Sequence, residues 1–348
     1  MDFTFTDEQR MIADTVRELL ADRCTGADLR RLMDSGEARD EARWQAIVEM
    51  GLTGLLVPES AGGLGLSEVD FVQIAEACGY FALPEPLVEQ VVAAPLLAAF
   101  ADKPQVAEVL ADVVAGTKTI ALAHPANPFV TDADRLLLVD GGALHLVDAA
   151  KATLTRRASI DPFRRLFTAE APLGADTLIG DAGAASGPLA QAFERHALFA
   201  AAQGLGLAQK SIDLGAAYAK ERTQFGKVIG GYQAVKHLLA TAQVAVEFAR
   251  PVVQAAAAQI GQDDVYARAR VSHAKLAALS AATHAAETSI QVHGAMGYSW
   301  EVDVHFYLKR ALALTGSYGD AAWHRARVMA RLTDLPLGPD TTFAREAA

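Results

Sequence analysis

A chain of 348 residues that is 51% hydrophobic and 21% charged is large enough to form two or three globular domains. Its formal net charge of −11 argues against nucleic acid as the main ligand, because binding to a phosphate backbone needs a basic surface. An anionic ligand would have to be held by local cations. The candidates are Arg222, Lys227, Lys236, His237 and Arg310.

The chain contains no uncharged apolar run of about 18 residues, so we expect no membrane span. The acidic start, with Asp2 after Met1, does not resemble a secretory signal. Two cysteines, Cys24 and Cys78, suit a reducing compartment and lack the spacing of a metal site. We therefore expect a cytoplasmic protein without a bound metal, in which both thiols are buried as small hydrophobic groups.

The first third of the chain has the pattern of helices. Thr6 with Gln9 forms one capping box, and Ser67 with Asp70 forms another, so each pair predicts a helix start. Between them, 62–65 predicts a glycine-rich loop. The strongly apolar run 91–100 predicts a buried helix.

The middle of the chain has the sequence pattern of strands instead of helices. Short apolar runs alternate with turn residues such as Gly141 and Gly142, which is typical of strands. The predicted strands are 119–123, 135–139, 143–147 and 165–168.

Long helical patterns return after these strands. In 234–250 the apolar and polar residues fall on opposite faces, and Pro251 is expected to kink or end that helix. A second pattern spans 265–293, with Gly294 as its C-cap, and a last helix is predicted over 303–332. The sequence therefore predicts an α+β fold that is mostly α. Its parts are an N-terminal helical domain (1–115), a reduced β domain (116–185) and a C-terminal helical bundle (186–348).

The most informative run lies between two of these helices, at 222–233. A guanidinium at Arg222 can hold a phosphate by paired charge-assisted hydrogen bonds, and the glycines at 226, 230 and 231 allow a close backbone approach. The ring of Phe225 could lie against a ribose or adenine, with Gln233 beside it. The run predicts a dinucleotide-binding loop. The alternative is a plain helix–loop–helix turn with an exposed arginine.

A second glycine-containing segment, 291–298, follows the next long helix. It carries the amide of Gln291 and the glycines Gly294 and Gly297. These residues predict contact with a phosphate or sugar. The alternative is a simple C-cap turn.

The order of these features resembles the acyl-CoA dehydrogenase family from end to end. The motifs that carry the resemblance are 57–59 with the following glycines, 218–227, 233–237 and 291–298. The match is most specific in the C-terminal helices. The short length and high alanine content resemble actinobacterial members of sterol side-chain degradation, which often form α2β2 heterotetramers.

The resemblance implies FAD as the cofactor, with one flavin site shared between two chains. The family equivalents of Arg222, Thr223, Phe225 and Gln233 hold the ADP part of an FAD that is bound mainly by a neighbouring subunit. The equivalents of Gln291, Gly294 and Ala295 contact it from the other side. Glycine usually stands where Ala295 does.

The resemblance also implies α,β-dehydrogenation of an acyl-CoA thioester, with an electron-transfer flavoprotein as acceptor. A carboxylate removes the α-proton while the β-hydrogen leaves as hydride to the flavin. The partner would be a second family subunit or another copy of this chain. A bulky, steroid-like acyl group is expected from the resemblance alone.

The expected catalytic base is missing. The family places a glutamate some way after an arginine like Arg310, and Gly319 stands there instead. Another family location points to Glu194, which lies about two residues out of register, with His196 nearer the expected place. A shift of two residues turns a helical side chain by roughly 200°. Asp320, beside the lost position, is the other candidate base.

The β domain also departs from the family pattern, because the strand motif that faces the flavin is replaced by His124 and Pro125. We therefore expect a subunit whose partner carries the base. One alternative is a flavin-dependent monooxygenase or oxidase on the same fold, which needs no such base. Another is a non-catalytic structural subunit.

Overall fold

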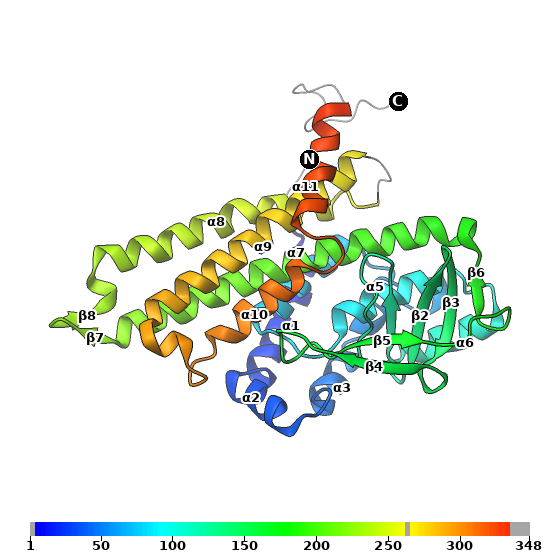
Figure 1. The fold of residues 1–348 in the computed structure, drawn as a ribbon, viewed down its shortest axis with the longest axis horizontal. Helices are drawn as coiled ribbons and strands as arrows, with labels where there is room; N and C mark the ends of the chain where they lie inside the picture. Colours follow the sequence, from blue (N-terminus) through cyan, green and yellow to red (C-terminus); the bar gives the residue numbers. More distant parts are fainter. Residues whose placement is uncertain (1–3, 262–264, 335–348) are drawn as a thin grey trace.

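The computed structural model describes residues 4–261 and 265–334. Figure 1 shows three long helices side by side, with a small sheet near one end and a short hairpin at the other. The N-terminal helices are α1 (Asp7–Arg23), α2 (Gly26–Ser35), α3 (Glu41–Glu49), α4 (Glu68–Tyr80), α5 (Leu87–Ala98) and α6 (Pro104–Val114). No helix in the described ranges is long and apolar enough to cross a membrane.

Local sequence signals set the starts of these helices. The Thr6 hydroxyl accepts a hydrogen bond from the Gln9 backbone N–H at 3.2 Å, and the Gln9 side chain accepts one from the Thr6 N–H at 3.0 Å. Ser67 and Asp70 form the same reciprocal arrangement before α4. Both predicted capping boxes are confirmed, since each satisfies N–H groups that a helix leaves unpaired.

The central sheet has the strand order β1-β2-β3-β6. Its strands are β1 (Ile120–Ala123), β2 (Arg135–Asp140), β3 (Ala143–Asp148) and β6 (Leu178–Gly180). β1 and β2 are parallel, whereas β3 is antiparallel to both of its neighbours. A separate antiparallel pair consists of β4 (Thr153–Arg157) and β5 (Leu166–Glu170). The four predicted strands are present.

The C-terminal part contains α7 (Ala182–Glu221), α8 (Gln233–Ala257), α9 (Val265–His293), α10 (Val304–Thr315) and α11 (Ala321–Asp334). Two helix ends differ from the predictions. α8 does not end at Pro251 but continues to Ala257, because Val246 and Val253 on either side of the proline are buried in the bundle. The predicted kink at Pro251 stays a prediction. The predicted last helix is two helices, separated by a turn in which Tyr318 and Gly319 have φ values of 50° and 87°.

α7 lies at the centre of the molecule. Every residue over 196–208 is buried, because α4, α5, α8, α9 and α10 pack around it. Its crossing with α4 is so close that a Cβ on Gly206 would lie 1.9 Å from the Glu76 carbonyl oxygen, and one on Gly79 would lie 2.0 Å from the Gln203 carbonyl oxygen. Glycine is therefore required on both helices at this crossing.

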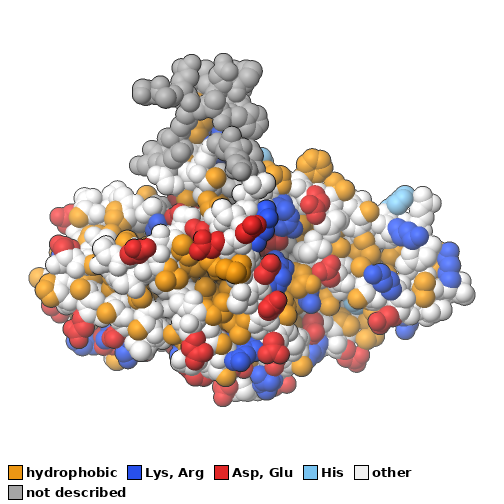
Figure 2. Space-filling model, turned by 180° about the vertical axis from the view of Figure 1, so that it is seen from behind, with side chains coloured by type: hydrophobic (Ala, Val, Ile, Leu, Met, Phe, Trp, Pro, Cys, Tyr) orange, Lys and Arg blue, Asp and Glu red, His pale blue; other side chains and the backbone are white. Residues whose placement is uncertain are grey.

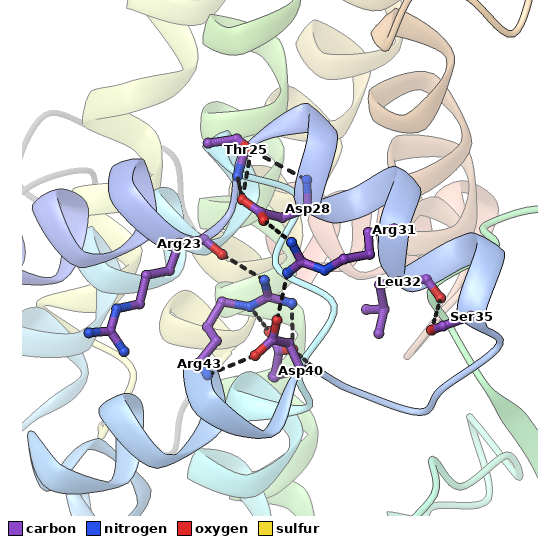
Figure 3. Close-up of polar contacts among 9 residues, drawn as sticks. Arg23, Thr25, Asp28, Arg31, Leu32, Ser35, Asp40 and Arg43 are labelled. Atoms are coloured by element: carbon purple, nitrogen blue, oxygen red, sulfur yellow. Dashed lines mark hydrogen bonds and ion pairs between the residues drawn. The ribbon is translucent and has the colours of Figure 1, made fainter.

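A buried ion pair connects α3 to the segment before α5. The Arg43 guanidinium donates to both carboxylate oxygens of Glu85 at 2.6 Å, and both side chains are almost completely buried. Arg43 also donates to the Arg23 carbonyl oxygen at 2.7 Å, while Arg31 bonds Asp40 nearby (Figure 3). This network holds α1, α2 and α3 against the loop at Glu85.

We expect Arg43→Met to lower the free energy of unfolding by about 3–5 kcal/mol, because the Glu85 carboxylate would remain buried without its partner. Urea unfolding measures this. The control is Arg10→Met, whose pair with Asp7 is exposed and is expected to contribute less than about 1 kcal/mol. Equal losses in the two variants would contradict the assignment.

Candidate functional site

The predicted dinucleotide-binding loop forms a small hairpin between α7 and α8. Its strands are β7 (Thr223–Gln224) and β8 (Lys227–Val228). Phe225 and Gly226 at the tip have φ values of 54° and 84°, and the Tyr232 hydroxyl donates to the Phe225 carbonyl oxygen at 3.0 Å. The Phe225 ring is 91% exposed, so this hairpin presents an aromatic face to whatever lies against it.

The hairpin end of the molecule is locally cationic. Arg222 ends α7 and Gln233 begins α8, and both side chains are exposed. Within the described ranges, the Arg222 guanidinium makes no hydrogen bond or ion pair. Figure 2 shows lysine and arginine side chains gathered at this end. An acidic chain can therefore hold an anion here.

The end of α9 lies beside the hairpin connection. His293 stacks on Tyr218 of α7, with ring centroids 4.4 Å apart, and this contact brings 291–295 near 222–233. Gln291, Gly294 and Ala295 are exposed. Gly294 has a φ of 58°, as a C-cap glycine does, and a Cβ there would meet nothing within 4 Å. Both predicted motifs thus lie at one end of the bundle.

A cavity of about 510 Å³ lies elsewhere, between the segment 37–41, α5, the loop 131–134, α7 and α10. A smaller chamber adjoins it, lined by His196 of α7, Asn127 and Tyr318. The two share one wall. The residues of this shared wall are Val88, Glu89, Thr131, Arg164, Gln203 and Leu314. Cys78 is buried and lines the larger cavity.

Aromatic rings fill the region behind the smaller chamber. His196 stacks on Tyr318 at 3.8 Å between ring centroids, and His124 lies 5.9 Å from Tyr318 and 5.4 Å from Phe193. Burial lowers the pKa of His196 to about 3 and that of His124 to about 4. Both imidazoles are therefore neutral at physiological pH.

The turn between α10 and α11 is held by a buried lysine. Lys275 Nζ donates to the carbonyl oxygens of Gly319 at 2.7 Å, Tyr318 at 3.4 Å and Ser317. His324 Nε2 lies 3.0 Å from the Tyr318 carbonyl oxygen. A Cβ at Gly319 would lie 2.7 Å from the Trp323 ring, so the turn has no room for a side chain there.

Both candidate bases have structural partners. Glu194 pairs with Arg327 of α11 at 2.5 Å, and Asp320 accepts a hydrogen bond from the Trp323 N–H at 2.8 Å at the start of α11. Neither residue lines the two chambers, whereas His196, two residues after Glu194, does. The identity of the base stays a prediction.

The sequence analysis missed Thr131, Arg164 and Lys275. Arg164 lies in an irregular stretch before β5, and Lys275 lies inside a helical pattern. The residues next to Arg164 and Lys275 in the sequence form no motif that would indicate a site, because the groups that these two side chains contact are far away in the sequence.

We expect the protein to lose stability as the pH falls below about 6.5, because unfolded His196 takes up a proton there while the folded residue does so only near a pKa of about 3. His196→Phe should flatten this dependence by about 1.4 kcal/mol per pH unit between these values. Urea unfolding at several pH values checks it. His284→Phe, at an exposed position on α9, is the control, and an identical change in both variants would contradict the prediction.

Comparison with known proteins identifies the family. The acyl-CoA dehydrogenase N-terminal domain matches residues 6–117, and the acyl-CoA dehydrogenase C-terminal domain matches 189–333. The chain is 33% identical to the acyl-CoA dehydrogenase IpdE2 of Mycobacterium tuberculosis over 315 residues, covering 88% of this chain and 91% of that protein. It is 31% identical to the acyl-CoA dehydrogenase FadE34 of the same species, covering 94% of this chain and 48% of that protein.

Solved structures share the fold. The ChsE4–ChsE5 complex from Mycobacterium tuberculosis matches with a TM-score of 0.83 at 24% identity, covering 97% of this chain and 100% of that chain. A glutaryl-coenzyme A dehydrogenase bound to glutaryl-CoA matches with a TM-score of 0.82 at 20% identity, covering 97% and 98%. The predicted fold class is confirmed. This chain belongs to the acyl-CoA dehydrogenase family of oxidoreductases, whose members are FAD-dependent flavoproteins.

Proposed function

We propose that this chain takes part in FAD-dependent α,β-dehydrogenation of an acyl-CoA thioester, as a subunit that shares each flavin site with a second chain. The single observation that carries the proposal is the separation of its two site regions. Arg222 and His196 lie on one continuous helix, α7, and are 26 residues apart. At 1.5 Å per residue this is about 39 Å, which exceeds the length of an extended FAD.

The hairpin end has the chemistry needed to hold the ADP part of FAD. Arg222 supplies an unpaired guanidinium for a phosphate, and the exposed Phe225 ring supplies a stacking face. Gln233, Gln291 and the open backbone at Gly294 complete the group of polar contacts. This end therefore reaches into a flavin site whose reacting part lies in the partner chain.

The reaction itself requires a base and an electron acceptor. The α C–H proton passes to a carboxylate, the β C–H bond gives up its electron pair as hydride, and a carbon–carbon double bond forms. When bound, FAD accepts that hydride, and an electron-transfer flavoprotein then removes the electrons. This chain has no room for a glutamate at Gly319, which supports a partner that carries the base.

Two comparisons support a paired assembly and a steroid-related substrate. The ChsE4–ChsE5 structure is a complex of two family chains, and a second structural neighbour is described as a steroid acyl-CoA dehydrogenase made of Tcur3481 and Tcur3483. One observation favours the alternative of a structural subunit. His196, Tyr318 and His124 pack together at the smaller chamber, whose volume of about 20 Å³ leaves room for about one water molecule.

We expect Arg222→Ala to weaken FAD binding about 10- to 150-fold, because loss of a charged hydrogen bond costs about 1.5–3 kcal/mol. Retention of flavin absorbance after gel filtration, followed by FAD titration, measures the effect in the assembled protein. Arg325→Ala, at an exposed position on α11, is the matched control. Unchanged FAD affinity in Arg222→Ala would contradict the assignment of this loop.

We expect the chain alone to lack acyl-CoA oxidation and to gain it when mixed with a second chain of the family that carries the catalytic glutamate. Ferricenium-linked oxidation of acyl-CoA thioesters measures turnover. Full turnover by the chain alone, abolished by Glu194→Gln, would instead identify Glu194 as the base and refute the shared-site proposal. A complex that never retains FAD would establish the structural-subunit alternative.

A further inference from the structure

The wall shared by the two chambers contains polar groups that the fold leaves without partners. Thr131 Oγ1 and Arg164 Nε are both buried and have no hydrogen-bond partner among the described residues. Leaving a buried polar atom unpaired destabilises a fold, because the atom loses its hydrogen bonds to water and gains none in return. Because buried polar atoms are normally paired, each exception needs an explanation, and a bound ligand is one.

Arg164 differs from the other arginines that line the larger cavity. Arg310 pairs with Asp161, Arg165 with Asp132, and Arg39 with Glu41. Arg164 has no carboxylate partner in the described part of the chain. Among the described residues, its side chain makes one hydrogen bond, from Nη1 to the Ala313 carbonyl oxygen at 3.1 Å. This bond holds the guanidinium near the end of α10, and Nε stays without a partner among the described residues.

Two further polar side chains complete the wall. Gln203 of α7 is 7% exposed, and Glu89 of α5 is half-buried. Neither side chain forms a hydrogen bond with another described residue. The wall therefore offers donors from Arg164, Thr131 and Gln203, together with the carboxylate of Glu89 and the acceptor oxygens of Thr131 and Gln203. An unsubstituted alkyl chain would pair with none of them and would leave the guanidinium desolvated.

We propose that this wall binds an acyl group that carries an acceptor oxygen, as a carboxylate or a ketone, on the part remote from the thioester. The inference rests on the proposed function only in taking an acyl-CoA thioester as the ligand. The larger cavity, about 510 Å³ in volume, has room for the oxygen-bearing end, whereas the smaller chamber, about 20 Å³, has room for about one water molecule. Arg164 selects for that oxygen through charge-assisted hydrogen bonds.

The test is calorimetric binding to the assembled, FAD-loaded protein. The probes are glutaryl-CoA, 5-oxohexanoyl-CoA and hexanoyl-CoA, which have similar lengths and differ in the terminal oxygen. We expect at least one oxygenated thioester to bind about 10-fold or more tightly than hexanoyl-CoA, as a charged hydrogen bond would provide. A preference for glutaryl-CoA identifies a carboxylate, and a preference for 5-oxohexanoyl-CoA identifies a ketone.

Arg164→Met should abolish this preference without weakening hexanoyl-CoA binding, because the alkyl chain then leaves no guanidinium desolvated. Thr131→Val removes a hydroxyl with almost no change of shape, so it tests the wall without disturbing the bond to Ala313. Arg325→Met is the matched control, and thermal melting confirms that each variant is folded.

The outcomes separate this inference from the proposed function. Equal binding of all three thioesters, or a preference that survives both Arg164→Met and Thr131→Val, overturns the oxygen-binding wall and leaves the dehydrogenase proposal intact. Failure of every thioester to bind overturns both.

Discussion

The burial of α7 on all sides is the constraint on which the rest of this structure depends. Over 196–208 the helix has no exposed residue. At its crossing with α4 the two backbones lie in direct contact, because glycines stand on both helices there. Because α7 is packed on all sides, it stays extended and keeps its C-terminal end far from His196. The loop at Arg222 and the chambers at His196 therefore stay apart, as the proposed sharing of each flavin site between two chains requires.

A second constraint acts where α10 meets α11. Lys275 and His324 hold the carbonyl oxygens of 317–319, and the left-handed φ of Gly319 places its Cα against the Trp323 ring. This turn forms a wall of the smaller chamber in place of a side chain with acid–base chemistry. The rigidity of this turn supports the proposal that it shapes the chamber and that another chain supplies the catalytic base.

Much of the fold could be predicted from the sequence because its signals are local. Capping at Thr6 and the C-cap at Gly294 are encoded within a few residues, and four strands are visible as short apolar runs. β4 was missed because it is largely exposed and rich in threonine and arginine, so it has no apolar face. The division between α10 and α11 was missed although its signal is local, since Gly316 ends α10 and Asp320 caps the start of α11.

The sequence by itself determined the family, the helical architecture and the exposed loop at Arg222, because consecutive residues carry each of these signals. Only the tertiary structure decided which side chains meet. It paired Glu194 with Arg327, and it brought Thr131, Arg164 and Gln203 to one cavity wall. The physical reason is that a side chain's partner depends on how its helix or strand is rotated and packed. No pattern of neighbouring residues records that rotation.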